Sequence, residues 1–415
     1  MAVAQFQNEA TQELIKQGKS LFLPSITVDA SFDKRDKERK FLTSSLPSND
    51  LLSGKKTNYE TYDYGVTLKQ PLFDYYAYSE YKKILAQTSL SDKQLIKAQQ
   101  DLIFRISKAY FEALLAKDQV DLFQHQRAAI QEQLSKAEVQ FEAGLISVTD
   151  INEAKTKKAL IEAQQISAVQ KLKIKKREIQ IITGKLPGKL TPLNPVIIFT
   201  EIDNLADDWI TIAQENNLEL QIKKDEIKIA ESEIDSRRSG HYPTIDAIAS
   251  RSRNWDKGGY PYGATKNEGI RSYSDTIGVE ISIPIFSGGM TSSKVREAVL
   301  LKSKLEEDVE YLRRGIELKV RDYYLSLQTN FSEISAYQQA MDAAALQLES
   351  TQLGFQEGLR NSVEVLDSQQ ILFNAKLNVL ESRYNYLMNF INLKLSVGML
   401  SISDLDEINQ YLMVN

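Results

Sequence analysis

The stretch 75–142 contains neither proline nor glycine, the two residues that most often end or interrupt a helix. As a single helix with a rise of ~1.5 Å per residue, this stretch would be roughly 100 Å long. Helices of ordinary globular proteins average ~11–12 residues. We therefore predict a chain built around a long helical rod, which an ordinary compact domain cannot contain.

The rod ends at a segment that occurs twice. Segments 141–150 and 355–364 are almost the same, and the offset that relates them also relates Gly184 to Gly398. An internal repeat this regular indicates two similar halves in one intertwined unit, rather than the two or three separate domains that the length alone would suggest.

Both segments are predicted to be sharp turns between antiparallel helices. Each has a glycine that can adopt the left-handed conformation at a helix end. An N-cap residue follows three positions later, and an acid three positions further on completes a capping box. These residues are Gly144, Ser147 and Asp150 in the first segment, and Gly358, Asn361 and Glu364 in the second.

Each half also has a pair of segments in which apolar and polar residues alternate, as in strands with one apolar face. The predicted strands are 26–32, 62–69, 245–250 and 276–283, and the prolines Pro71 and Pro284 are expected to stop the second and the fourth. The polar stretches 33–61 and 251–271 between them are predicted to be long exposed loops. The tyrosine-rich stretches 59–64 and 260–273 suggest either aromatic belts at a membrane surface or ordinary loop tyrosines.

Further helices are predicted in both halves and between them. Their ranges are 5–20, 148–182, 205–216, 218–238, 291–356 and 362–397. In the last of these, apolar residues from Phe373 to Ile391 recur in alternating steps of four and three, which is typical of a coiled-coil seam. The fold class is thus mainly α with a small β part.

Composition excludes several classes of protein. The net charge of −5 and the pI of about 5.5 argue against nucleic-acid binding. The chain has no cysteine, which rules out disulfides and thiolate metal sites. We also find no apolar run long enough for a transmembrane helix, no signal peptide, and no motif for catalysis or for a cofactor. We therefore expect neither an enzyme nor a cofactor or metal site.

An open sheet of four strands with one apolar face needs a partner or a membrane to cover that face. The smallest closed barrels have about 8 strands. A trimer would supply three times four strands, with apolar faces toward lipid and polar faces toward a lumen. The helical rods would then extend the barrel as a hollow tube.

Nearly the whole chain resembles the TolC family of outer-membrane efflux and secretion channels. The resemblance rests on the strand-to-helix corners 70–73, with Pro71 and Phe73, and 283–286, with Pro284 and Phe286. Two Phe-x-x-Gly tips, the helix-ending Gly184 and Gly398, and the run Val365-Leu366-Asp367 add to it.

The resemblance implies a homotrimer with a 12-stranded barrel in the outer membrane of a Gram-negative bacterium. A helical barrel would cross the periplasm, and a periplasmic adaptor with an inner-membrane pump of the RND or ABC type would open its tips. The implied function is an exit duct for drug efflux, type I protein secretion or both. By comparison with the second half, the front of the first helix and a signal peptide are expected to be missing.

We expect four regions along the chain. Residues 1–184 form the first structural repeat and 185–204 a connector. Residues 205–398 form the second repeat, and the tail 399–415 packs at the middle of the tunnel.

The resemblance places selectivity acids at Glu364 and Asp367. Three copies would surround the tip opening with carboxylates, which favour cations and attract multivalent blocking ions. The alternative is that both acids only cap a helix, and this alternative is stronger for Glu364.

The resemblance also implies a gate latch, in which Arg360 ties neighbouring hairpins together with Asp150 as acceptor. The alternatives are a solvated turn arginine and a capping aspartate. Phe355 stands where the family often has a gate tyrosine, so a hydrogen bond from that side chain is not expected. A soluble coiled-coil scaffold is the alternative for the whole chain, although it gives the four strands no role.

Overall fold

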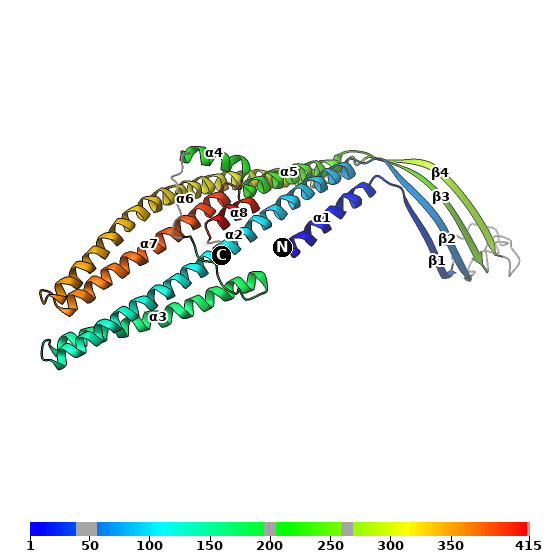
Figure 1. The fold of residues 1–415 in the computed structure, drawn as a ribbon. Helices are drawn as coiled ribbons and strands as arrows, with labels where there is room; N and C mark the ends of the chain where they lie inside the picture. The colour runs from blue at the N-terminus through cyan, green and yellow to red at the C-terminus, as the bar shows by residue number, and fades with distance from the viewer. Residues whose placement is uncertain (39–55, 195–198, 200–204, 259–268, 413–415) are drawn as a thin grey trace, which may run out of the picture. The chain divides into compact units, whose positions relative to one another are not determined.

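The computed structural model describes residues 1–38, 56–194, 199, 205–258 and 269–412. They form long helices and one four-stranded sheet (Figure 1). In chain order the first half contains α1 (Ala2–Ser20), β1 (Ser25–Glu38), β2 (Lys56–Phe73), α2 (Tyr75–Glu142) and α3 (Val148–Thr183). The remainder contains α4 (Ala206–Asn216), α5 (Leu218–Arg238), a 3₁₀ turn (Ser239–His241), β3 (Thr244–Lys257), β4 (Ile270–Ser282), α6 (Met290–Gln356), α7 (Ser362–Ser396) and α8 (Ile402–Gln410). The predicted fold class, mainly α with a small β part, is confirmed.

The described residues divide into two compact units. One unit comprises Met1–Ala4, Lys93–Ile222 and Asp308–Asn415, and the other comprises Gln5–Asp92 and Lys223–Glu307. The first contains the two helical hairpins, and the second contains the sheet.

The hairpins α2–α3 and α6–α7 pack through an apolar core. Phe111 and Leu114 of α2 and Leu387 and Ile391 of α7 are fully buried there. Tyr384 is buried among them, and its hydroxyl donates to Asp118 Oδ2 at 2.7 Å. The predicted seam along α7 faces the core: Phe373, Tyr384, Leu387 and Ile391 are buried, and Leu377 and Leu380 are half-buried.

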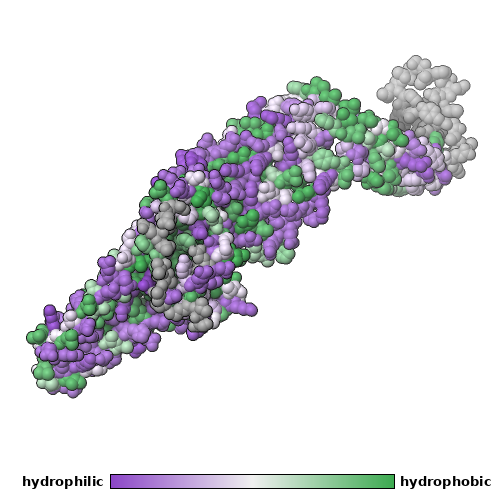
Figure 2. All heavy atoms as spheres, turned by 45° about the horizontal axis from the view of Figure 1, so that its top comes forward, coloured by the Kyte–Doolittle hydropathy of each residue, from purple (hydrophilic) through white to green (hydrophobic). Residues whose placement is uncertain are grey.

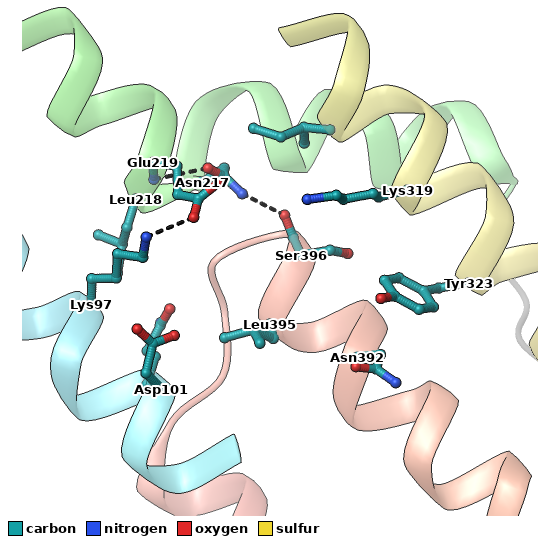
Figure 3. Close-up of a pocket in the computed structure, with 12 residues that line it drawn as sticks. Lys97, Asp101, Asn217, Leu218, Glu219, Lys319, Tyr323, Asn392, Leu395 and Ser396 are labelled. Carbon is teal, nitrogen blue, oxygen red and sulfur yellow. Dashed lines mark hydrogen bonds and ion pairs between the residues drawn. The ribbon is translucent and has the colours of Figure 1, made fainter. Parts of the chain in front are cut away.

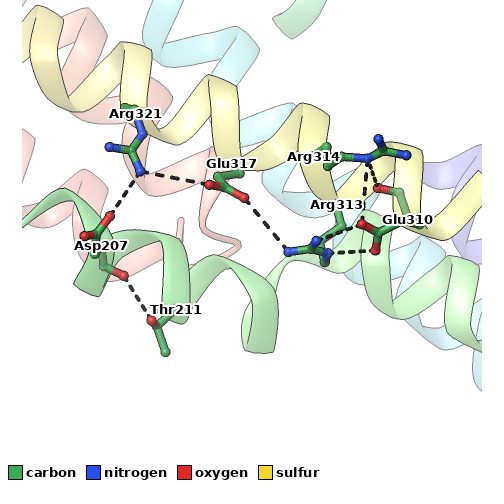
Figure 4. Close-up of polar contacts among 7 residues, drawn as sticks. All are labelled: Asp207, Thr211, Glu310, Arg313, Arg314, Glu317 and Arg321. Atoms are coloured by element: carbon green, nitrogen blue, oxygen red, sulfur yellow. Dashed lines mark hydrogen bonds and ion pairs between the residues drawn. The ribbon is translucent and has the colours of Figure 1, made fainter.

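The short helix α4 is attached to α6 by surface charges (Figure 4). Arg321 Nη2 lies 3.1 Å from Asp207 Oδ1 and 3.9 Å from Glu317 Oε1. Arg313 of α6 forms ion pairs with both Glu317 and Glu310 of the same helix. Of these pairs, only Arg321–Asp207 joins α4 to α6, and an exposed pair of this kind stabilises by only ~0–1 kcal/mol. Ile210 and Ala213 of α4 also pack in the apolar core.

The tail contacts the connector and the end of α7. Leu412 forms an isolated antiparallel bridge with Leu193, and Lys394 Nζ lies 3.1 Å from Asp404 of α8. These contacts attach the tail to the hairpin unit.

The sheet is antiparallel, with strand order β1-β2-β3-β4. Its register aligns the apolar residues across neighbouring strands: Val28 opposes Val66, and Ile245 opposes Ile281. Many apolar side chains of this face are exposed in the single chain: Val28 of β1 is 74% exposed and Ile277 of β4 is 90% exposed, whereas Ile245 of β3 is half-buried. Figure 2 shows hydrophobic side chains gathered over the sheet, whereas the helices are largely hydrophilic.

The strands are longer than predicted, so the loop boundaries 33–61 and 251–271 were wrong. Strand β1 continues to Glu38, β2 begins at Lys56, and β3 continues to Lys257. The charged ends of these strands lack the apolar alternation on which the prediction depended, and backbone pairing with a neighbour extends them nonetheless. The remainder of the predicted loops, 39–55 and 259–268, lies outside the described residues.

Strand β2 also runs past Pro71 to Phe73, with a shift of register between these two residues. Pro71 was predicted to stop this strand. A proline can stay in a sheet where the ladder is irregular, because the missing N–H then leaves no pairing unmet.

Among the helices that the structure describes, none combines the length and the apolar composition needed to cross a bilayer.

Candidate functional site: the hairpin tips

The two tips are built alike, as their sequences predict. In the first, Gly144 has a φ of 73°, Ser147 Oγ accepts from the backbone N–H of Asp150 at 3.4 Å, and Asp150 Oδ2 accepts from that of Ser147 at 3.1 Å. In the second, Gly358 also has a φ of 73°. Asn361 Oδ1 accepts from the N–H of Glu364 at 2.9 Å, and Glu364 Oε1 accepts from that of Asn361 at 3.4 Å.

The capping acid Glu364 has a second role at its tip. Its Oε2 accepts a hydrogen bond from Arg360 Nη1 at 2.6 Å. This bond to Arg360, helped by the bond from the Asn361 backbone, lowers the pKa of Glu364 from its usual value. Within the protomer, Arg360 thus binds Glu364, whereas Asp150 caps its own helix.

Gly354 makes this position of Arg360 possible. A Cβ added at Gly354 would lie 2.9 Å from Arg360 Cγ, closer than side chains tolerate. The backbone N–H of Arg360 also donates to Gly354 O at 3.1 Å. Sequence analysis did not single out Gly354, because it stands inside a helical pattern and only the folded tip shows what it faces.

Asp367 is joined to the other hairpin. Lys157 of α3 donates to the Asp367 carboxylate of α7, and its Nζ also lies 3.1 Å from Glu153 Oε1. Burial lowers the pKa of Lys157, but the hydrogen bonds that Lys157 donates to Asp367 and Glu153 outweigh burial and raise it overall. Lys157 therefore stays charged and neutralises Asp367. The sequence gives no local signal for Lys157, since its partner is far away along the chain.

The structure brings the two predicted acids into one hollow. Glu364, Asp367 and Arg360 line a space of about 360 Å³ together with Thr351, Ser368 and side chains of α6 and α7. Phe355 is half-buried at the end of α6. Asp150 belongs to the other tip and does not line this hollow.

The predicted corner residues lie where strands give way to helices. Phe73 ends β2, and Asp74 Oδ1 accepts from the N–H groups of Tyr76 and Ala77, capping α2. Phe286 follows β4 and is 88% exposed. An aromatic ring as bare as this in one chain is available to contact a lipid or a second chain.

A polar pocket of about 150 Å³ lies between α2, α5, α6 and α7 (Figure 3). Its groups bond to one another: Lys97 Nζ lies 2.6 Å from Glu219, and the Asn217 amide donates to Ser396 O at 2.7 Å. The first bond joins α2 to the start of α5, and the second joins the start of α5 to the end of α7, so the pocket is a structural junction. Within the described part of the chain, no cluster of three or more His, Cys, Asp or Glu side chains is arranged to hold a metal ion.

Comparison with known proteins shows which protein family this chain resembles. The model of the outer membrane efflux protein family matches residues 1–185 and 209–399. The outer membrane protein TolC of Vibrio cholerae serotype O1 is 28% identical over 415 residues, covering 98% of this chain and 89% of that protein. The proteases secretion protein PrtF of Dickeya chrysanthemi is 26% identical over 412 residues, covering 98% and 86%.

Solved structures show the same fold at lower identity. The outer membrane protein VceC of Vibrio cholerae aligns with a TM-score of 0.77 at 14% identity, covering 96% of this chain and 92% of that one. The outer-membrane channel OprN aligns with a TM-score of 0.79 at 15% identity, covering 96% and 86%.

Proposed function

Because this chain belongs to the family of outer membrane efflux proteins, we propose that it is the exit duct of an export system and that three copies form the channel. The observation that carries the proposal is the sheet. One of its faces is apolar and bare, and within the described residues its outer strands β1 and β4 each pair with a single neighbour. Three copies joined at these edges would close a barrel of twelve strands, which removes the open edges and turns the apolar face to lipid.

The helical hairpins then extend the duct into the periplasm. A duct of this kind does no work itself, so a periplasmic adaptor and an inner-membrane RND or ABC pump would supply the cargo and the energy. Relatives named for efflux and relatives named for protease secretion both cover most of this chain. We accordingly propose drug efflux, type I protein secretion or both.

We propose the two tips as the entrance of the duct. Glu364 and Asp367 would form a ring of carboxylates in the trimer, and the hollow that both acids line supports this. Arg360 would be the latch. Its exposed guanidinium already binds one carboxylate, and it can exchange Glu364 for Asp150 of a neighbouring protomer when the tips meet. Phe355 would add apolar contact to this latch.

We further propose that 1–184 and 205–398 are two structural repeats joined by the connector 185–204. Each contains a strand pair followed by a long helix, a tip and a shorter helix. The tail 399–415 would lie at the middle of the tunnel, which its contacts with Leu193 and Lys394 support.

An export assay tests this function. The chain is expressed with its own adaptor and pump in a Gram-negative strain that lacks an outer-membrane efflux channel. We expect drug resistance or release of a secreted protein to be restored. If neither is restored while the protein is trimeric in the outer membrane, the proposal is wrong.

A further inference from the structure

Toward the strand ends that lie farther from the helices, the side chains on the apolar face of the sheet become aromatic and basic. Strand register places Tyr64, Arg253 and Tyr273 in one cross-strand row, and Phe32, Tyr62, Trp255 and Arg271 in the next. Side chains alternate between the two faces of a strand, so these rows share the face of Val28, Val66 and Ile277. The face is therefore mainly apolar near the helices, carries the Arg251–Asp275 pair farther along, and is both aromatic and basic at its end.

Cations and rings interleave in these rows. Arg253 Cζ lies 5.3 Å from the ring centre of Tyr273, and Arg271 Cζ lies 5.0 Å from that of Trp255. Lys257 Nζ approaches Trp255 at 6.0 Å, and the Trp255 ring stacks on Tyr62 with centres 5.2 Å apart. Stacking on a ring leaves the guanidinium N–H groups free to bind an anion at the same time. We call Arg253, Trp255, Lys257, Arg271 and Tyr273 the basic-aromatic belt.

The belt has an excess of positive charge. Arg251, one row nearer the helices, is neutralised by Asp275, with Nε 3.2 Å from Oδ1. Within the described residues no carboxylate pairs with Arg253, Arg271 or Lys257, and Glu60, in the next row, accepts from the Tyr62 hydroxyl. Lys34 and Lys257 lie on either side of Glu60 in the register, and the three side chains line a hollow of about 380 Å³ that holds two cations and one carboxylate. The belt thus offers several cations to a ligand of opposite charge.

The distance from the strand-to-helix corners to the belt matches the height of the apolar band of an outer-membrane barrel. From Ile245 to Trp255 the strand rises by roughly 33 Å, at ~3.3 Å per residue. With the strand tilt of ~35–45° that is usual in barrels, the vertical rise is about 25 Å, the height of the apolar band of outer-membrane barrels. If the corners near Pro71 mark the periplasmic boundary, the belt is level with the headgroups of the outer leaflet.

We propose that the basic-aromatic belt binds the phosphate groups of lipids in the outer leaflet. Arginine forks fit phosphate oxygens in pairs, and the neighbouring rings contact the apolar region just beneath. The cations point to the lipid side, so cargo in the lumen cannot be their ligand. The proposal rests on the membrane placement of the sheet given under the proposed function, and it adds the lipid chemistry that the barrel selects.

Fluorescence quenching tests this site. Trp209 and Trp255 are the chain's only tryptophans, so Trp209→Phe leaves Trp255 as the sole reporter. The trimer is reconstituted in phosphatidylcholine containing either brominated phosphatidic acid or brominated phosphatidylcholine. Each cation near the surface favours an anionic lipid by roughly fivefold. We expect phosphatidic acid to quench Trp255 at a several-fold lower mole fraction than phosphatidylcholine does.

The variant Arg253→Gln/Lys257→Gln/Arg271→Gln, which removes all three belt cations, should reduce this preference to nearly one. The matched control is Arg35→Gln, which removes a cation from the opposite face near the same end, where Arg35 pairs with Asp33 at 3.1 Å, and it should keep the preference. Equal quenching by the two lipids in the unsubstituted belt, or loss of the preference in the control, would overturn the proposal. Absence of quenching by either lipid would instead contradict the membrane placement on which it rests.

Discussion

At the scale of single residues, the acids proposed for the tip ring each have a cationic partner. Arg360 binds Glu364 within one tip, and Lys157 reaches Asp367 from the other hairpin. The charge of the ring is therefore partly neutralised in the protomer. A change of either cation alters the field at the entrance without touching an acid.

We expect Lys157→Gln to strengthen cation selectivity. The substitution leaves Asp367 without its cation, and exposed pairs are worth ~0.2–1 kcal/mol, so block by a trivalent cation should need roughly 1.4- to fivefold less of the blocker. Asp367→Asn should act in the opposite direction. Lys136→Gln is the control, because its pair with Glu132 lies within α2 and includes neither ring acid. Planar-bilayer titrations measure the block, and an unchanged titration in both Lys157→Gln and Asp367→Asn would exclude a role for Asp367 in the ring.

Arg360→Ser should have a different effect, because it removes the latch as well as a cation. Loss of ~0.5–1.5 kcal/mol in each of three protomers can shift a closed-to-open ratio by tenfold or more. Single-channel conductance should rise and larger antibiotics should enter, with the trimer intact. Lys157→Gln should leave conductance nearly unchanged. Wild-type conductance in intact Arg360→Ser trimers would make Arg360 a solvated turn residue.

The same substitution has a pH signature. Arg360 holds the pKa of Glu364 below its usual value of 4.5, so the carboxylate stays charged to lower pH than an isolated glutamate would. Cation selectivity in the wild type should accordingly persist as the pH falls through 4.5. In Arg360→Ser, cation selectivity should begin to decline at a higher pH than in the wild type.

Residue-scale features were predictable where they depend on neighbours in sequence. The left-handed glycines and both capping boxes follow from spacing alone, since each bond joins residues three positions apart. Lys157 and Gly354 were not predictable, because their partners meet them only in the folded tip.

At the scale of elements, the helix ends are set by glycines that no other residue can replace without strain. Gly358 has a φ of 73°, and nothing lies within 4 Å of a Cβ added there. The cost of a side chain at this position is therefore the backbone strain itself, about 1 kcal/mol.

Gly358→Ala should loosen the second tip. We expect amides at the end of α6 to exchange with solvent roughly fivefold faster, as follows from a local cost of about 1 kcal/mol. Gly315→Ala is the matched control, since Gly315 stands inside α6, its Cβ would also meet nothing, and its φ is not positive. There alanine should slow exchange slightly, because it favours the helix. Hydrogen exchange of the trimer measures the amide exchange rates in both variants. Equal effects of the two substitutions would contradict the role given to Gly358.

The helices were predicted to within a few residues and the strands were not. A 3.6-residue pattern without proline, ended by glycine, marks both ends of a helix such as α2. A strand such as β1 continues through Asp33 and Lys34 because it pairs with β2. Its apolar alternation ends earlier, so the pattern shows only the part of the strand that would face lipid.

At the scale of the whole molecule, the sheet decides between a channel and a soluble scaffold. A scaffold has no use for an apolar face left bare along four strands, whereas a trimeric barrel buries both its edges and its face. The sequence predicted this architecture through the paired strand segments and the internal repeat.

The measurement that tests the account most directly is the current carried by purified protein in a planar bilayer, with the mass of the same sample determined beforehand. We predict a trimer that needs detergent to stay dispersed. It should insert as a channel of low resting conductance whose reversal potential under a salt gradient shows preference for cations. A protein that stays dispersed without detergent and carries no current would contradict the account and favour the scaffold.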